Sequence, residues 1–216
     1  MPGAVCPNCG VPLVNFLMLN ALDPVLGLAG IGLTHLPLLH CPRCKLFDAE
    51  FVYRVAPGHR IDIITANEGR EPWLSEAWRE LHPDGQIAEI GCWLRPMPDA
   101  VQAVIDKATA QGDRSLDASE LQTFASFTGY FADEEVGGHP YFDMVNQVGG
   151  RPFLEQGPPD AWCPYCARDG RQEEMQFLAC LINDPARDLH IIYPECYLTF
   201  CICTVCSSVT AEQFAL

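Results

Sequence analysis

Apolar residues gather in short runs at both ends of the chain, and each run stops at a turn signal. Residues 16–22 are followed by Asp23-Pro24, and residues 177–182 are followed by Asn183-Asp184-Pro185. Apolar runs of this length between turn residues are typical of buried β-strands. We therefore expect both ends of the chain to consist mainly of strands.

The middle of the chain begins with a hairpin pattern. Residues 51–55 and 61–64 are rich in Val, Ile and aromatic side chains, and Pro57-Gly58 lies between them. β-Branched and aromatic residues favour strands, and a Pro-Gly pair favours the turn that joins them. Another apolar run, residues 87–94, predicts a buried strand further along.

Three segments of the middle region carry apolar residues at helical spacing. The pattern predicts a short helix over 72–81, a longer helix over 98–110 and a third over 117–130. The apolar face expected for the second helix comprises Val101, Val104, Ile105 and Ala108. In the third helix, Asp117 and Glu120 have the spacing of a capping box, which marks a helix start.

The longest apolar stretch, residues 11–39, could be mistaken for a membrane span. Asp23 is its only acid, and it has no Lys or Arg. A span needs ~20 predominantly apolar residues in an unbroken helix. Pro12, Pro24 and Pro37 interrupt the stretch, and a helix interior tolerates Pro poorly. We therefore expect no membrane association.

The chain is strongly acidic. Its 13 Lys and Arg stand against 28 Asp and Glu, a formal net charge of −15, and Lys45 and Lys107 are the only lysines. Residues 51–150 hold most of the excess, with 7 basic and 16 acidic residues. Phosphate contacts need clustered Lys and Arg, so we expect no direct binding of nucleic acid. The same charge favours a basic partner, or simply a soluble surface.

Eight of the twelve cysteines form four C-x-x-C pairs: Cys6/Cys9, Cys41/Cys44, Cys163/Cys166 and Cys203/Cys206. The first two pairs are separated by 31 residues, and the last two by 36. Two thiolates three positions apart on a tight turn can bind one ion, and a second turn completes the tetrahedron. The spacing predicts two structural zinc ions, each held by two pairs in succession.

The residues within and after the pairs suit such turns. Pro follows the first Cys in three of the four pairs, and its fixed φ favours a turn. Gly10 directly follows Cys9 and can supply a positive φ where the chain leaves the knuckle. Backbone N–H groups of such a knuckle can donate to the sulfurs and support their charge.

Disulfides and a redox-active C-x-x-C are the alternatives to zinc. Residues 1–6 contain no basic stretch followed by an apolar one, so we expect no export signal and a cytosolic protein, where thiols stay reduced. A redox motif usually occurs singly at a helix N-terminus, whereas these pairs occur two by two. Closed four-thiolate sites leave no open position for water, which favours a structural role.

Four further cysteines lie outside these pairs: Cys92, Cys180, Cys196 and Cys201. The first two stand in apolar runs, where Cys usually packs as a small hydrophobic residue. Cys201, and more weakly Cys196, could replace a ligand of the second site, but the spacing of Cys203 and Cys206 favours that pair. His40, next to Cys41, could compete as a ligand, although an ordinary surface or core role fits it better.

The two cysteine regions share one order of features: knuckle, apolar run, Asp-Pro turn, apolar run, knuckle. This order predicts an internal repeat of two zinc-ribbon-like β units. We expect an α+β fold in which residues 1–56 and 148–216 form these units and residues 57–147 form an acidic segment of strands and helices between them. The two ribbon units could also pack as one domain.

Known catalytic motifs are missing from the sequence. It has no Gly-rich phosphate loop before a helix, no H-E-x-x-H and no G-x-S-x-G. The acid pairs Glu134/Glu135 and Glu173/Glu174 are typical of solvated faces. The six His are scattered without ligand spacing, and only His139, in a Gly-Gly turn, merits a test. We expect a protein that is not an enzyme.

The C-terminal third has a motif order that resembles a known family. Val148-Gly149-Gly150-Arg151-Pro152-Phe153 and Gln156 lead into Trp162-Cys163-Pro164-Tyr165-Cys166, then Met175-Gln176-Phe177-Leu178 and the last C-x-x-C pair. This order resembles the TYPP-type domain of the programmed cell death protein 2 family and its uncharacterised bacterial relatives. Phe153 stands where Trp is common in the family, and Cys180 where Gln is common. Gly137-Gly138-His139-Pro140 is an alternative place for the family's turn.

The resemblance implies binding rather than chemistry. Eukaryotic members act as dedicated chaperones of a basic ribosomal protein, and bacterial relatives look like immunity proteins encoded near toxins. With the acidity of the chain, this implies a zinc-binding interaction module that neutralises a basic protein, in the first place a bacterial toxin. Chaperoning a ribosomal protein is the alternative, and a C-x-x-C redox protein is a further one.

Overall fold

The computed structural model describes residues 4–44, 51–56, 58, 60–66, 80, 95–128, 146–150, 162–182 and 196–215. The chain divides into two compact units. The first comprises Met1–Glu89, Asn146–Gly150 and Pro159–Leu216, and the second comprises Ile90–Val145 and Arg151–Pro158. The fold is mixed α+β, with antiparallel sheets and one short helix in the first unit and two longer helices in the second.

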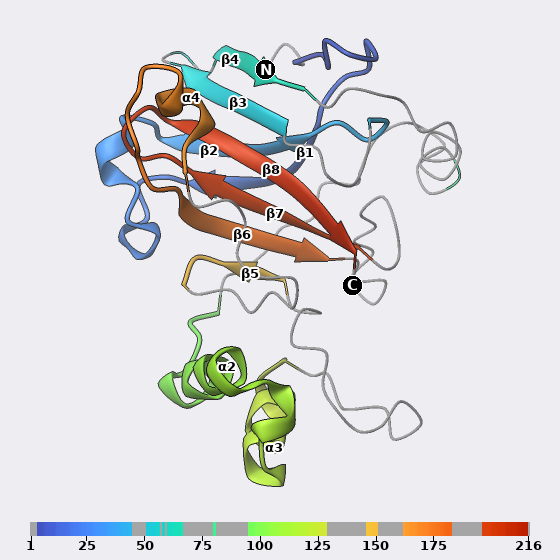
Figure 1. Ribbon diagram of the computed structural model, residues 1–216, viewed down its shortest axis with the longest axis vertical. Helices are drawn as coiled ribbons and strands as arrows, with labels where there is room; N and C mark the ends of the chain where they lie inside the picture. Colours follow the sequence, from blue (N-terminus) through green and yellow to red (C-terminus); the bar gives the residue numbers. More distant parts are fainter. Residues whose placement is uncertain are drawn as a thin grey trace. The chain divides into compact units, whose positions relative to one another are not determined.

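The described part of the first unit contains two antiparallel sheets (Figure 1). The small sheet pairs β1 (Val14–Asn20) with β2 (His35–His40). The large sheet has six strands in the order β4-β3-β8-β7-β6-β5. Their bounds are Phe51–Ala56 for β3, Arg60–Thr65 for β4, Gln147–Val148 for β5, Gln176–Ile182 for β6, Cys196–Ile202 for β7 and Ser208–Ala215 for β8.

The strands expected near the cysteine pairs are confirmed. The apolar runs at 16–22 and 177–182 fall largely in β1 and β6, and the hairpin expected over 51–64 is the antiparallel pair β3–β4. Gly58, at the hairpin turn, has a φ of 76°. β1 carries a bulge between Asn15 and Leu17, and β6 carries one between Phe177 and Ala179. Both bulges therefore come early in the strand that follows a cysteine knuckle.

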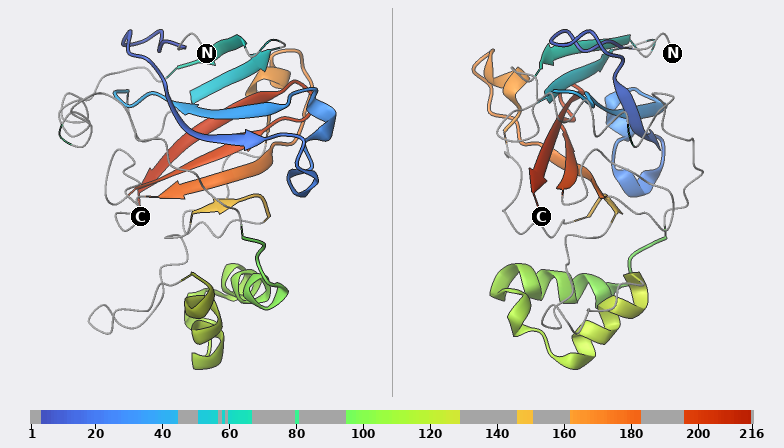
Figure 2. Two further views of the ribbon diagram at one scale, coloured as in Figure 1. Left: turned by 180° about the vertical axis from the view of Figure 1, so that it is seen from behind. Right: turned by 90° about the vertical axis from the view of Figure 1, so that its right-hand side faces the viewer.

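The main apolar core joins the two sheets, whose arrangement is also visible from behind in Figure 2. Leu19, Leu36 and Leu38 of the small sheet belong to the same packed cluster as Phe51 and Phe200 of the large sheet. These side chains are almost fully buried. Burying a Leu or Phe side chain stabilises a fold by ~1.5–3 kcal/mol, so this shared core holds the two sheets together.

Tyr53 of β3 supplies a polar tie between the sheets. Its hydroxyl donates to the carbonyl oxygen of Pro37 at 2.7 Å and accepts from the backbone N–H of Leu39 at 2.9 Å. The side chain is fully buried, and burial raises the pKa of its hydroxyl far above the usual value. Tyr53 thus satisfies two backbone groups on β2, the strand that leads into Cys41.

Removal of the Tyr53 hydroxyl should destabilise the fold. We expect Tyr53→Phe to lower the free energy of unfolding by ~1–3 kcal/mol, because it leaves a buried N–H and a buried C=O without their partner. Urea unfolding measures the change. Tyr165→Phe is the matched control, since the Tyr165 hydroxyl is half-buried and accepts a 3.3 Å bond from the Arg54 side chain rather than from buried backbone groups. An equal loss in both variants would contradict the assigned role of Tyr53.

The second unit contains two helices, α2 (Asp99–Gln111) and α3 (Ala118–Thr128), with a short 3-10 turn, η4 (Asp113–Ser115), between them. All four residues expected on the apolar face of α2 are buried. The capping box is confirmed, because Glu120 N–H donates to Asp117 Oδ1 at 2.9 Å and Asp117 N–H donates to Glu120 Oε2 at 2.8 Å. Lys107 joins the two helices through an ion pair with Glu120 at 2.7 Å.

The apolar stretch at 11–39 is divided between short elements. It holds β1, two 3-10 turns (Pro24–Leu26 and Ala29–Ile31) and most of β2. Asp23 caps the first turn by accepting from Val25 N–H at 3.0 Å. Within the described part of the chain, no helix is long and apolar enough to cross a membrane.

Some expectations fall on residues that the structure does not describe. The strand at 87–94 and the turn at 137–140 lie wholly outside the described residues, as do Lys45 and Cys92. Of the helix expected over 72–81, only Glu80 is described, and it is helical.

Candidate metal centres

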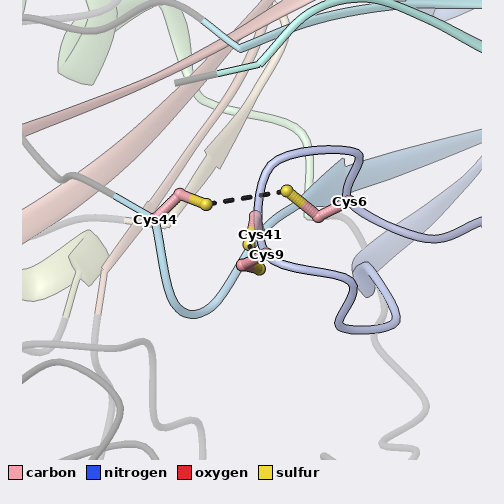
Figure 3. Close-up of side chains that lie close together, drawn as sticks. All are labelled: Cys6, Cys9, Cys41 and Cys44. Carbon is pink, nitrogen blue, oxygen red and sulfur yellow. Dashed lines mark hydrogen bonds between the residues drawn. The ribbon is translucent and has the colours of Figure 1, made fainter. Parts of the chain in front are cut away.

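The first four cysteines meet in one cluster although 31 residues separate their two pairs (Figure 3). Their four sulfurs all lie within 4.8 Å of one another. Cys6 Sγ lies 3.6 Å from Cys44 Sγ, and Cys9 Sγ lies 3.4 Å from Cys41 Sγ. Cys9 is half-buried and the other three are buried, so the cluster is closed on most sides.

The pairing of β1 with β2 brings these two knuckles together. Val14, at the start of β1, is opposite His40, at the end of β2. Cys9 precedes the first strand and Cys41 follows the second, so both knuckles lie at the same end of the small sheet. An antiparallel pair that begins and ends beside a knuckle converts distant sequence positions into one four-sulfur site.

The last four cysteines form a second cluster in the same way. β6 and β7 pair antiparallel, with Gln176 opposite Ile202, and the knuckles flank this end of the pair. All four sulfurs lie within 4.8 Å of one another. Cys163 Sγ is 3.6 Å from Cys206 Sγ, and Cys166 Sγ is 3.9 Å from Cys203 Sγ. Cys206 is half-buried and its three partners are buried.

The sulfur separations fit a tetrahedral metal ion. Four thiolates at ~2.3 Å from a central ion, the usual Zn–S bond length, would be ~3.8 Å apart. The closest separations in the two clusters are 3.4–3.9 Å. A disulfide needs ~2.05 Å between the sulfurs, and all eight of these cysteines are free. Each cluster could therefore hold one metal ion.

Two of the four knuckles share one backbone geometry. In the first, Gly10 N–H donates to Cys6 C=O at 2.9 Å and Cys6 N–H donates to Val11 C=O at 2.8 Å. In the last, Ser207 N–H donates to Cys203 C=O at 2.9 Å and Cys203 N–H donates to Ser208 C=O at 2.9 Å. The residue after the second Cys has a positive φ in both, 74° for Gly10 and 58° for Ser207.

Gly10 therefore supplies the positive φ expected from the sequence. Ser207 has a backbone conformation that residues other than glycine rarely adopt. A non-Gly residue there costs about 1–3 kcal/mol and persists only where its surroundings hold it. The two hydrogen bonds of the knuckle are such a constraint. The only sequence signal for Ser207 was its place after a C-x-x-C pair, parallel to that of Gly10.

The third knuckle is helical instead. Cys163 caps the short helix α4 (Pro164–Ala167), and Cys166 N–H donates to Cys163 Sγ at 3.4 Å. Pro164 follows the capping residue directly, where its fixed φ suits a helix start and its missing N–H is not needed. The helix is contacted by β3, because Arg54 donates to the Tyr165 hydroxyl at 3.3 Å.

Two polar side chains support the sulfurs, and sequence reasoning missed both. Asn8 Nδ2 donates to Cys44 Sγ at 3.3 Å in the first cluster. In the second, the buried Ser208 hydroxyl lies 3.2 Å from Cys163 Sγ and 3.0 Å from Cys206 Sγ. The Ser208 hydroxyl is thus within hydrogen-bond distance of both sulfurs, although it can donate its proton to only one of them at a time. Such outer partners orient metal ligands and stabilise their charge.

The protonation of the thiols differs within each cluster. Burial tends to raise the pKa of Cys6 and of Cys163, but hydrogen bonds more than offset it and lower both pKa values. The Cys9 and Asn8 backbone acts on Cys6, and the Ser208 hydroxyl and the Cys166 N–H act on Cys163. Cys6 and Cys163 therefore ionise more readily than an ordinary cysteine.

The remaining shifted thiols favour the protonated form while no cation is bound. Burial raises the pKa of Cys44 to about 12 and that of Cys203 to about 11, and it raises the pKa values of Cys41 and Cys166 strongly. A cation among the four sulfurs would displace these protons, because only thiolates serve as ligands.

Three of the other cysteine and histidine candidates, Cys201, Cys180 and His40, lie outside the two clusters. Cys201 is buried in the same apolar group as Cys163 and Cys203, but it is not one of the four gathered sulfurs, and burial raises its pKa to about 12. Cys180 is buried on β6, as expected of a small hydrophobic residue. His40 is a buried core residue with its ring edge against Phe51, and burial lowers its pKa to about 4. Nothing is described of the Cys196 side chain.

Removal of either outer hydrogen-bond donor should weaken metal binding at one cluster only. We expect Ser208→Ala to weaken metal binding ~10–100-fold at the second cluster only, and Asn8→Ala to do so at the first only, because each donor contacts one cluster. Competition with a chromophoric chelator resolves the two metal equivalents. Each variant is the control for the other, and a loss at both clusters in either one would contradict separate support.

Comparisons of the chain with protein-family models, with curated proteins and with solved structures found no match. The metal centres are therefore interpreted from the chain's own geometry.

Proposed function

We propose that this protein is a non-enzymatic, zinc-binding interaction module that binds and neutralises a basic protein. The two closed four-thiol clusters are the observation that carries the proposal. Four sulfur ligands leave no open position for water or substrate, so an ion bound there would hold the fold rather than perform chemistry. The eight cysteines at 6, 9, 41, 44, 163, 166, 203 and 206 are the proposed ligands.

Zinc is the metal that this donor set favours. Tetrahedral four-sulfur sites bind zinc or iron, and zinc suits a structural site because it has no redox chemistry. Metal analysis of the purified protein should find two zinc equivalents per chain. Iron in place of zinc, or one equivalent only, would contradict this assignment.

We also propose that the two metal-binding halves are copies of one zinc-ribbon-like unit. Each contains a knuckle, two paired strands and a second knuckle, and each has a bulge early in its first strand. The halves differ in one knuckle, since 163–166 forms a helical turn. The resemblance of the C-terminal half to the TYPP-type domain is part of this proposal.

The acidity of the chain supports a basic partner. The formal charge of −15 falls by a further four when eight thiolates bind two divalent ions. A strongly anionic surface accelerates association with a cationic partner and disfavours anionic ones, nucleic acid included. A bacterial toxin is the partner that the family resemblance favours, and a basic ribosomal protein is the alternative.

Co-purification at two salt concentrations tests this function. The zinc-loaded, tagged chain, expressed in its source cell, should retain a basic protein at low salt and release it at high salt, because surface charge pairs are screened by ions. If the chain retains no basic protein, the proposed function is wrong. A partner whose expression kills cells lacking this chain would identify immunity, whereas a change in ribosomal subunit profiles on deletion would identify the chaperone.

A further inference from the structure

An exposed tryptophan lies directly beside the second cysteine cluster. Trp162 precedes Cys163, and 56% of it is exposed. Val205 precedes Cys206 in the facing knuckle and is 55% exposed. Trp162 and Val205 are thus each next in the chain to one of two ligand cysteines whose sulfurs are 3.6 Å apart. Trp is among the residues that most often dominate binding at protein interfaces.

The backbone at Trp162 is held in place. Trp162 pairs with Glu174 in an isolated antiparallel bridge, and Cys163 N–H donates to Glu173 C=O at 2.8 Å. The four-sulfur cluster follows immediately in the chain. A large side chain presented on a rigid frame loses little conformational entropy on binding, which favours affinity.

A carboxylate stands across the backbone bridge from Trp162. Glu174 is exposed and stands opposite Trp162 across the bridge, where paired Cβ atoms lie ~4.5–5.5 Å apart. Four thiolates around a divalent ion would add a charge of about −2 next to it. The nearby Arg168 and Arg171 are engaged within the chain, the first with Ile64 C=O and Thr65 and the second with Asp169.

The molecule already binds an arginine in this manner on the same knuckle. The Arg54 guanidinium lies over the Tyr165 ring at 5.4 Å from its centre, and it donates to Asp62 at 3.0 Å. An aromatic face and a carboxylate thus hold one guanidinium between them. Trp162 and Glu174 present the same two chemical groups to solvent, and a Trp face attracts a cation more strongly than a Tyr face.

We propose that Trp162 and Glu174 bind an arginine side chain of the basic partner, with Val205 contacting the apolar part of the same segment. The planar guanidinium can stack on the indole while its N–H groups donate to the carboxylate. This assignment rests on the proposed function and names the contact residues for it.

A short arginine-rich peptide and its citrulline counterpart provide the test. Citrulline keeps the shape of arginine but removes the charge. The zinc-loaded full chain should bind the arginine peptide at least tenfold tighter than the citrulline peptide, as measured by calorimetry at low salt. Trp162→Ala should weaken binding about three- to tenfold, Trp162→Phe less, and Glu174→Gln several-fold. Val25→Ala, at an apolar side chain that is 83% exposed in the same unit, should leave binding unchanged.

The possible outcomes distinguish a failure of the proposed arginine site from a failure of the proposed function. Tight binding of the arginine peptide that Trp162→Ala leaves unaltered, or that Val25→Ala weakens equally, overturns the site and leaves the proposed function standing. Equal binding of both peptides by the unaltered chain overturns both. Two zinc equivalents in every variant establish that the substitutions have left the clusters intact.

Discussion

Removal of metal from the two cysteine clusters is expected to unfold the first compact unit. Structural zinc contributes ~10–16 kcal/mol in isolated fingers, whereas the net stability of a domain is ~5–15 kcal/mol. Both clusters belong to this unit, and each lies at the end of a strand pair. Without the ions, the four thiols at each site, three of them buried and one half-buried, would lose the bonds that gather them. A strong chelator should therefore abolish the cooperative thermal transition of the sheets.

Substitution of a single ligand cysteine should show that stability depends on metal binding at one cluster. We expect Cys163→Ser to lose one of two zinc equivalents and to lower the free energy of unfolding by about 5 kcal/mol or more. Cys201→Ala is the matched control, because Cys201 is buried in the same apolar group but lies outside the four gathered sulfurs. It should keep both ions and lose only ~1–2 kcal/mol of packing energy.

Metal analysis and thermal unfolding of the two variants measure these effects. The structural role of the second cluster is wrong if Cys163→Ser keeps both ions or unfolds at the temperature of the unaltered chain. Loss of an ion from Cys201→Ala would instead show that Cys201 serves as a ligand, the alternative that the sequence left open.

The metal clusters could be predicted from the sequence because their geometry is mostly local. Two cysteines three residues apart need only a tight turn to share an ion, and apolar runs between the pairs indicated the strands that bring the turns together. The pairing of β1 with β2 and of β6 with β7 has this form. The helix faces of the second unit were equally local, since spacing and the capping box define them within α2 and α3.

The supporting contacts could not be predicted because they join residues far apart in the chain. The Ser208 hydroxyl contacts a sulfur 45 positions away, and nothing in its immediate sequence distinguishes it from other serines near a turn. The placement of β3 beside β8 depends on how the whole core packs. The tie of Tyr53 to β2 depends on that same packing, since the two lie in different sheets.

Acidification is expected to release the metal steeply. In the metal-free clusters at neutral pH, Cys41, Cys44, Cys166 and Cys203 hold their protons, since their pKa values are raised. Binding an ion must displace at least these two protons at each cluster. By linkage, the metal affinity of each cluster then falls at least ~100-fold for every pH unit of acidification.

The direction of this pH dependence follows from whether the metal-free or the metal-loaded protein binds more protons. The metal-free protein binds more protons than the loaded one, so acid favours the metal-free protein and base favours the loaded one. Since the ions hold the sheets together, the stability of the loaded protein should fall as the pH falls from 8 to 5. Without metal, the four thiols with raised pKa values add no such slope between pH 5 and 8, because they stay protonated in both the folded and the unfolded chain; above the unfolded thiol pKa of about 8.5 they lower the stability as the pH rises.

Chelator competition at several pH values measures the slope, and calorimetry in buffers of different ionisation enthalpy counts the protons directly. Cys180→Ala is the matched control, since its thiol is buried but lies outside both clusters, and it should leave the slope unchanged. An affinity independent of pH, or one that rises in acid, would mean that the thiols are already ionised before metal binds. In that case, burial would not control the protonation of these clusters.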